Sequence, residues 1–245
     1  MTNNVRETSL EHRRSDASTR SIRTAGLVAG ISLMAMAVLA GFGNFVAVEG
    51  LVTPGDAAKT ADDILAAEGT FRLGVLALYL VVVLDVVIAW ALMRVFDPVS
   101  RSLSRLAAWF RLAYSAVFMV AISQLAGIPD LLGGSSGAFT PEQMAAQALQ
   151  KVDAYNDIWF AGLILFGAHL VVIGYLACKS GYVPTLLGIL VVIAGLGYAF
   201  DSFGTVLSES PLEVSVVTFI GEFLLGVWLL IRGRRVTVGT DDHAI

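Results

Sequence analysis

The sequence predicts an all-α polytopic membrane protein, a bundle of six transmembrane helices with both termini in the cytoplasm. Three observations support this fold class. The 245 residues are 56% hydrophobic and only 15% charged, whereas soluble domains carry charge on about a quarter of their residues. Six apolar runs approach the roughly 20 residues with which a helix crosses a bilayer. The density of basic residues alternates from one connection to the next.

The six predicted spans leave only short connections and two tails, so a separate soluble domain has no room. They are residues 25–48, 73–93, 106–128, 158–178, 184–207 and 214–231, within a transmembrane domain of residues 25–232. The first run is longer than the roughly 7–15 apolar residues of a signal-peptide core. We therefore expect it to be retained, although Val38 and Ala40 also fit a cleavage site.

Lysine and arginine set the orientation of a membrane protein. The tail before span one, the connections after spans two and four and the tail after span six are rich in them. The alternate connections hold only Lys59, Arg72 and Lys151, among many acidic residues. Both termini are therefore expected in the cytoplasm, and the protein in the inner membrane of a bacterium.

The tails are polar and too poor in large apolar residues to form a core. We expect residues 1–24 to be a disordered cytoplasmic tail and residues 233–245 to form a second one. In the first external connection, Thr60 stands three residues before Asp63, a spacing typical of a helix N-cap.

The longest external connection contains a clear helix start. Thr140 fits an N-cap, Pro141 the first helical position and Gln143 the partner of the threonine in a capping box. We expect an amphipathic helix resting on the external surface, with a lid over a binding site as the alternative. Further along, Gly181 suits a helix C-cap and Pro184 the next helix start, which predicts an antiparallel hairpin of spans four and five.

Several function classes lack support in the sequence. Cys178 is the single cysteine, so no intrachain disulfide forms. Zinc-type cysteine pairs, phosphate-binding glycine loops and nucleophile elbows are absent, and no cofactor is expected. The basic tails are explained by topology and anionic lipid rather than nucleic acid. The expected partners are the lipid bilayer and a small-molecule or lipid ligand; no protein partner is indicated.

Many short motifs follow one another in a distinctive order. They are FRLG (71–74), DVV (85–87), DPVSRSL (97–103), AAWFRL (107–112), FGAHL (166–170), GYL (174–176), KSGYVP (179–184), GLGY (195–198), DSF (201–203), GE (221–222) and WLLIRG (228–233). This set resembles the bacterial membrane family Domain of Unknown Function 4386 over about residues 25–233. The resemblance implies six spans and lends no activity. The family often carries Lys where this chain has Asp97.

One pair of opposite charges is predicted within the spans. A charge at the bilayer centre costs roughly 2.5–3.5 kcal/mol on insertion scales, so such residues pair or face water. At a rise of about 1.5 Å per residue, Asp85 lies roughly 18 Å below the external surface and Arg111 roughly 8 Å from the cytoplasmic one. We expect a structural ion pair between them.

A second group is predicted nearer the external surface. His169 lies roughly 16 Å deep, Glu222 roughly 12 Å and Asp201 roughly 9 Å at the same helical rise. Tyr198 is on the same helical face as Asp201, and Arg72 stands at the external mouth. The pattern indicates a polar cavity that is open to the outside.

Three functions fit this group. In the first, which we favour, the residues bind or transport a small molecule or lipid, His169 exchanges protons with the two carboxylates and Arg72 acts as a gate. In the second, His169, Asp201 and Glu222 hold a metal in a membrane-embedded hydrolase, although one histidine is a thin ligand set. In the third, they are polar contacts that hold the bundle together. No catalytic residue is assigned.

Overall fold

The structure is a computed structural model that describes residues 2–134, 139–207 and 219–233, and all regular elements in that part of the chain are helices. Its elements are α1 (Thr2–Gly41), the π-helical η1 (Phe42–Val48), the 3-10 turn η2 (Glu49–Leu51), α2 (Ala57–Ala66), α3 (Glu68–Phe96), α4 (Arg101–Ala126), α5 (Ile128–Gly133), α6 (Pro141–Lys179), α7 (Thr185–Leu207) and α9 (Ile220–Arg232). The all-α class is confirmed.

Five segments of the described residues are long and apolar enough to cross a membrane. They are Arg20–Leu51, Glu68–Phe96, Arg101–Gly133, Pro141–Lys179 and Thr185–Gly204, and each contains most of one of the first five predicted spans. The predicted sixth span begins at residue 214, outside the described residues, and α9 covers residues 220–231 of it. Six spans therefore stay a prediction, as does the tail of residues 234–245.

α3 shows why these helices belong in lipid. Its exposed large apolar residues recur every three or four positions: Leu73, Leu76, Leu80, Val83, Val86 and Trp90. A contiguous apolar stripe of this length on a helix surface is unusual in water and is matched by a hydrocarbon environment. The opposite face is buried and contains Asp85 among aliphatic side chains. The helix therefore carries one polar group toward the interior of the bundle.

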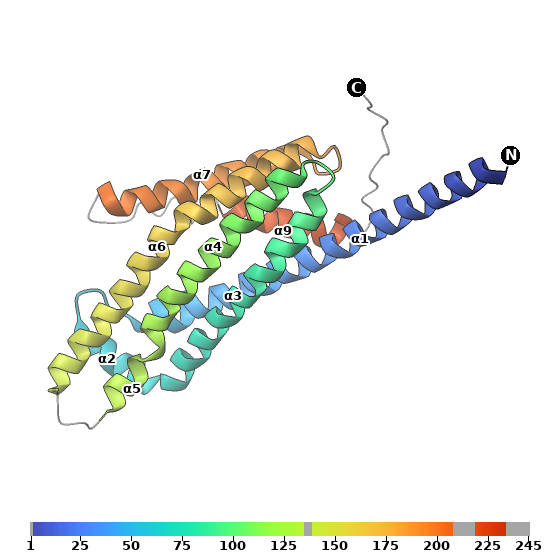
Figure 1. The fold of residues 1–245 in the computed structure, drawn as a ribbon. Coiled ribbons are helices and arrows are strands. Elements are labelled where there is room, and N and C mark those ends of the chain that lie inside the picture. The colour runs from blue at the N-terminus through green and yellow to red at the C-terminus, as the bar shows by residue number, and fades with distance from the viewer. Residues whose placement is uncertain (1, 135–138, 208–218, 234–245) are drawn as a thin grey trace.

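Six helices of the described residues form a closed ring. α1 packs against α3, α3 against α4, α4 against α6, α6 against α7, α7 against α9 and α9 against α1. Figure 1 shows α6 and α7 running side by side, with α4 and α3 following across the bundle. The ring places α9, which comes last in the described chain, between α7 and the first helix.

Glycines allow a close backbone approach between α6 and α7. A Cβ atom on Gly167 would lie 2.5 Å from the Gly195 carbonyl oxygen, and one on Gly174 would lie 2.7 Å from that of Gly188. Any larger residue would push the two backbones apart. The turn that joins the helices contains Gly181 at φ +70°, a left-handed conformation that favours glycine. These contacts hold α6 and α7 together as a hairpin.

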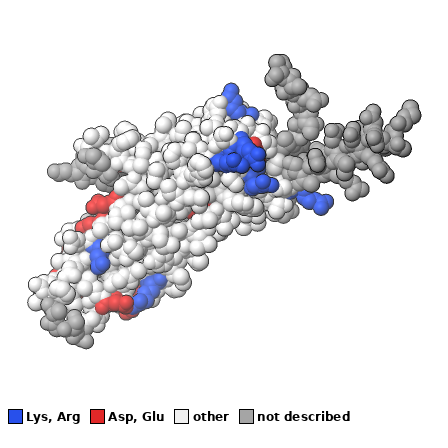
Figure 2. All heavy atoms as spheres, viewed as in Figure 1, with Lys and Arg blue, Asp and Glu red and all other residues white. Residues whose placement is uncertain are grey.

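The charged side chains separate toward the two ends of the bundle. In Figure 2, Lys and Arg gather over the α3–α4 connection and the α6–α7 turn, most of the middle carries no charge, and Asp and Glu are seen toward the other end, together with some Lys and Arg. The basic end contains Arg94, Arg101, Arg105, Lys179 and Arg232. The opposite end of the bundle carries Arg72, Glu68 and Asp130.

Two predicted features differ in the structure. α1 begins at Thr2, so the backbone of residues 2–24 is helical where a disordered tail was expected, and it projects beyond the bundle (Figure 1). The N-cap of α2 is Asp56, whose carboxylate accepts from the Lys59 amide at 2.9 Å. Thr60 instead bonds the Thr53 backbone, so the threonine closes the preceding loop rather than capping the helix.

The helix start at Thr140 is confirmed, with both bonds of the capping box formed. The amphipathic surface helix and its lid alternative are not supported, because this segment runs without a break into the membrane span as α6. Ala145, Ala148 and Val152 are buried, and α6 packs there against α2 and α5. The apolar face that suggested an interfacial helix is covered by protein.

Candidate functional site

Arg111 lies at the centre of the site. It projects from the middle of α4, on the face that also buries Ala107, Ala108 and Tyr114, and its side chain is 0% exposed. A guanidinium stays charged under all ordinary conditions and carries five N–H donors. Its burial is therefore tolerable only where other elements supply acceptors and negative charge.

Two carboxylates supply that charge. Asp85 from α3 places Oδ1 2.8 Å from Nε and 2.7 Å from Nη2 of Arg111. Glu222 from α9 accepts from Nη1 through Oε1 at 2.9 Å. The remaining Nη2 donor points to the Met36 sulfur of α1 at 3.4 Å. The arginine thus connects four helices of the ring.

His169 completes the set of acceptors from α6. Its Nε2 lies 3.1 Å from Nη1 of Arg111, and its Nδ1 lies 2.9 Å from the carbonyl oxygen of Ala107. Because arginine only donates and a carbonyl only accepts, Nδ1 carries the proton and Nε2 is bare. The imidazole is therefore neutral, with both nitrogens engaged. The Phe166 ring, 5.1 Å from the guanidinium carbon, adds a cation–π contact.

These residues form one layer instead of the two expected. Asp85, Arg111, His169 and Glu222 each lie ten or eleven residues from the end of their helix at the basic end. At about 1.5 Å per residue, this level is roughly 15 Å from those ends. The expected depths of His169 and Glu222 were measured from the starts of apolar runs. α6 begins at Pro141, far before its apolar run, so counts from the starts of different runs do not share one reference level.

The layer carries an unbalanced formal charge. Arg111 contributes one positive charge, Asp85 and Glu222 contribute two negative charges when ionised, and His169 is neutral in the tautomer that its bonds require. The sum is −1. Asp85 is 1% exposed, whereas Glu222 is 8% exposed. The excess negative charge is therefore accessible at Glu222.

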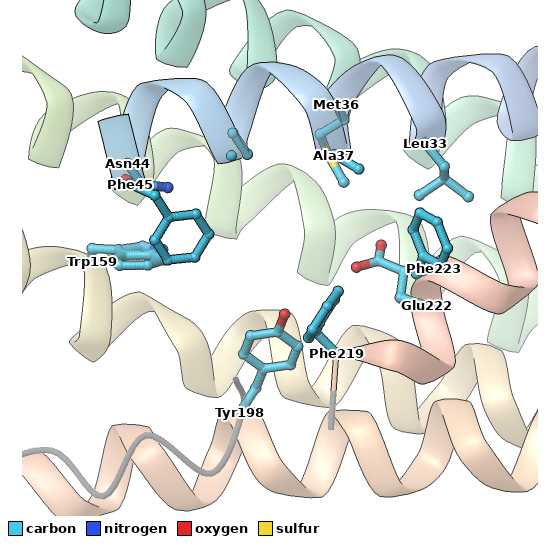
Figure 3. Close-up of a pocket in the computed structure, with 12 residues that line it drawn as sticks. Leu33, Met36, Ala37, Asn44, Phe45, Trp159, Tyr198, Phe219, Glu222 and Phe223 are labelled. Atoms are coloured by element: carbon cyan, nitrogen blue, oxygen red, sulfur yellow. The ribbon is translucent and has the colours of Figure 1, made fainter. Parts of the chain in front are cut away.

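Glu222 lies on the wall of a cavity of about 260 Å³. The cavity extends beyond the N-terminal end of α9, and its walls come from α1, η1, α6, α7 and α9. Figure 3 shows Glu222 and Leu33 at one end, Asn44 and Trp159 at the other, and the hydroxyl of Tyr198 directed inward. The lining residues are Leu33, Met36, Ala37, Ala40, Gly41, Asn44, Phe45, Trp159, Tyr198, Phe219, Glu222 and Phe223.

The far end of the cavity is held by polar contacts of its own. Asn44 Oδ1 accepts from the Tyr155 hydroxyl at 2.5 Å, which fastens η1 to α6. Trp159 Nε1 donates to the Tyr114 hydroxyl at 3.1 Å, which fastens α6 to α4. Both contacts rigidify the wall, and neither brings a charge to it. Among the lining residues, Glu222 is the charged one.

Two of the predicted site residues lie elsewhere. Arg72 pairs with Glu68 and Asp130 at 2.7 Å each, on the exposed surface away from the basic end, and does not line the cavity. Asp201 is fully buried, but it is 16 residues from the start of α7 at Thr185, about 24 Å at 1.5 Å per residue. It is therefore roughly 9 Å above the Arg111 layer along the helix rise.

The proposed metal ligands His169, Asp201 and Glu222 do not fit a metal. His169 has no free nitrogen lone pair, and its Nε2 and Glu222 Oε1 both face the guanidinium of Arg111. A divalent cation beside them would meet a fixed positive charge. No group of three His, Cys, Asp or Glu side chains in the described residues is placed to hold a metal ion.

Sequence reasoning missed several members of the site. Phe166 stands three residues before His169, and this spacing on a helix places both on one face, so the pair was discoverable. Met36 is an ordinary apolar residue of the first span, and the Ala107 carbonyl has no side-chain signature. The contacts of these two with the site depend on how the helices pack.

Comparison with known proteins finds an uncharacterised relative and a family profile that match this chain. An uncharacterised protein of Archaeoglobus fulgidus is 32% identical over 163 residues, which cover 66% of this chain and 85% of that protein. The relative is archaeal, whereas the sequence resemblance implied a bacterial family. No solved structure matches the chain. A family profile matches residues 28–233, and the chain therefore belongs to the family described as Domain of unknown function (DUF4386).

Proposed function

We propose that this multi-pass membrane protein binds a small molecule or a lipid in the cavity beside Glu222, as a binding protein or as the first step of transport. The observation that carries the proposal is a buried carboxylate on the wall of a largely apolar cavity within the helix ring. Ligand sites typically combine apolar walls with one or a few placed polar groups. Glu222 and the Tyr198 hydroxyl are such groups here.

The orientation belongs to the same proposal. The basic end is expected to face the cytoplasm under the positive-inside rule, with both termini on that side and the protein in the plasma membrane. Along α1, the cavity then runs from Leu33 near the Arg111 layer outward to Asn44. A ligand is expected to enter from the external half.

A structural role is the second candidate, and it applies to a different part of the same cluster. Arg111, Asp85 and His169 are almost fully buried and are joined by short polar contacts. Such networks help to hold helices together in lipid. We assign these three residues to stability and Glu222, which also meets the cavity, to ligand binding.

Fluorescence quenching can test occupation of the cavity. Trp159 lines it, whereas Trp109 is 66% exposed on the outer face of α4. Two proteins are prepared in nanodiscs, one that retains Trp159 and one that retains Trp109 as its single tryptophan, with the others replaced by Phe. The probe is neopentylbromobenzene, a neutral apolar molecule whose bromine quenches tryptophan on contact.

The expected result is saturable quenching of Trp159 and unsaturable, partition-driven quenching of Trp109. Ala40→Phe, which fills the cavity wall, should weaken the saturable component several-fold. Val38→Phe is the matched control, because Val38 is on the same helix and 72% exposed. Parallel, unsaturable quenching of both tryptophans, unchanged by Ala40→Phe, would show that the probe reaches them only through the bilayer.

A further inference from the structure

The ligand class is indicated first by charge. Arg111 cannot balance both Asp85 and Glu222, so the layer has a formal charge of −1 within the membrane. A net charge at this depth is unfavourable unless a proton or a cation balances it. Asp85 receives two contacts from Arg111 and is sealed from the cavity. Glu222 is where a balancing cation can reach the layer.

The side chains around Glu222 leave space for a cation beside its carboxylate. Arg111 from α4 engages Oε1, and His169 from α6 is turned to the same guanidinium. In Figure 3, the Glu222 carboxylate points into the space between α1 and the Tyr198 hydroxyl of α7. Among the described residues that line this space, there is no second acidic residue and no basic residue. An anionic ligand would therefore be repelled, whereas a cation would find a partner.

The walls specify the kind of cation. Aromatic rings of five described residues line the cavity: Phe45, Trp159, Tyr198, Phe219 and Phe223. Aromatic faces attract alkylated ammonium groups through cation–π contacts, worth about 2 kcal/mol or more when desolvated. A hard metal cation takes about six or more oxygen ligands, and with few oxygens in the lining most of these would be waters held against aromatic and aliphatic walls. Aliphatic side chains such as Leu33 favour an apolar body on the ligand.

We infer that the cavity binds a monovalent organic cation, an alkylated ammonium group with an apolar or aromatic substituent, whose charge is paired with Glu222 and whose body is enclosed by the aromatic walls. This inference rests on the proposed function, because it names the chemical class of ligand for the same cavity. The cavity volume of about 260 Å³ limits the size of the ligand. This volume is near the lower end of the roughly 300–1,000 Å³ typical of ligand pockets.

The test uses two probes that differ only in charge. Bromobenzyltrimethylammonium is a cation, and neopentylbromobenzene has a carbon atom in place of its nitrogen. Both are titrated into the single-tryptophan protein that retains Trp159, and each concentration is corrected for partition into empty nanodiscs. We expect the cation to saturate the quenching at a concentration at least tenfold lower than the neutral probe.

Two variants test whether the charge of Glu222 causes the difference between the two probes. Glu222→Gln keeps an oxygen for Arg111 and removes the charge, so the ratio of the two half-saturating concentrations should fall to about one. Glu142→Gln, at an exposed position at the start of α6, should leave the ratio unchanged. Circular dichroism in the same nanodiscs verifies that both variants remain folded.

The outcomes separate the two claims. A ratio near one in the parent protein, with both probes saturable, would overturn the cation class and leave binding in the cavity intact. A high ratio that survives Glu222→Gln would overturn the role of Glu222 and with it the inference. Unsaturable quenching by both probes would refute the proposed function itself.

Discussion

Replacing Arg111 by Met should be among the most damaging single changes in the bundle. Methionine preserves much of the side-chain length and removes every donor, so two carboxylates and a histidine lose their partner. Charged hydrogen bonds contribute about 1.5–3 kcal/mol each, so three such acceptors set an upper bound of roughly 9 kcal/mol. Protonation of the released carboxylates reduces this cost toward the roughly 3–5 kcal/mol of a broken buried ion pair.

Arg72→Met is the matched control. Arg72 also binds two carboxylates, those of Glu68 and Asp130, at 2.7 Å each, but its side chain is 49% exposed, compared with 0% for Arg111. Solvent screens the exposed pairs, and we expect this variant to lose less than about 1 kcal/mol. The two variants therefore compare the same chemical change at different burial.

The measurement is the free energy of unfolding from titration with sodium dodecyl sulfate in mixed micelles, followed by circular dichroism. A loss of about 3–5 kcal/mol is expected for Arg111→Met, and Asp85→Asn with Glu222→Gln in the same chain should recover most of it by removing the unpaired charges. Equal stability of Arg111→Met and Arg72→Met would refute the reasoning. So would a triple variant no more stable than the single one.

The remaining predictions concern packing and orientation. Gly167→Ala places a Cβ 2.5 Å from the Gly195 carbonyl oxygen and should lower the free energy of unfolding by about 1–3 kcal/mol in the same titration. Gly41→Ala is the control and should cost no stability, because a Cβ there meets nothing within 4 Å. Equal losses of stability in the two variants would contradict the close contact of α6 and α7. In a Cys178→Ser background, a membrane-impermeant maleimide should label Asp62→Cys in intact cells and Ser102→Cys only after lysis. The reverse pattern would invert the orientation.

Much of the architecture was predictable from the sequence because its signals are local. The length of an apolar run decides whether a helix can span a bilayer, and five such helices are present in the described residues. The capping box at Thr140 is formed as expected, since its two bonds join residues three apart. The segment after that cap was misjudged, because its apolar face is covered by α2 and α5, which only the fold brings near.

The candidate site was predictable in composition and less so in arrangement. Asp85, Arg111, His169 and Glu222 stood out because ionisable groups within apolar runs are costly. Their separation into two layers came from counting depth along runs whose ends do not coincide with the helix ends. Arg72 and Asp201 were included because they too are ionisable residues within or beside apolar runs. The exposed ion pairs of Arg72 and the helical rise along α7 to Asp201 place both residues outside the layer.

By itself, the sequence determined the all-α membrane class, the positions of five long apolar helices and the gathering of basic residues at their connections, because run length and charge are properties of the chain that survive any packing. The tertiary structure alone decided that α9 closes the ring beside α1 and brings Glu222 to Arg111, which is already bound to Asp85 and His169. A buried charge pairs with whichever opposite charge lies next to it. Arg111 and Glu222 are 111 positions apart in the sequence, and they become neighbours only through the order of the helices in the ring, which no local sequence pattern encodes.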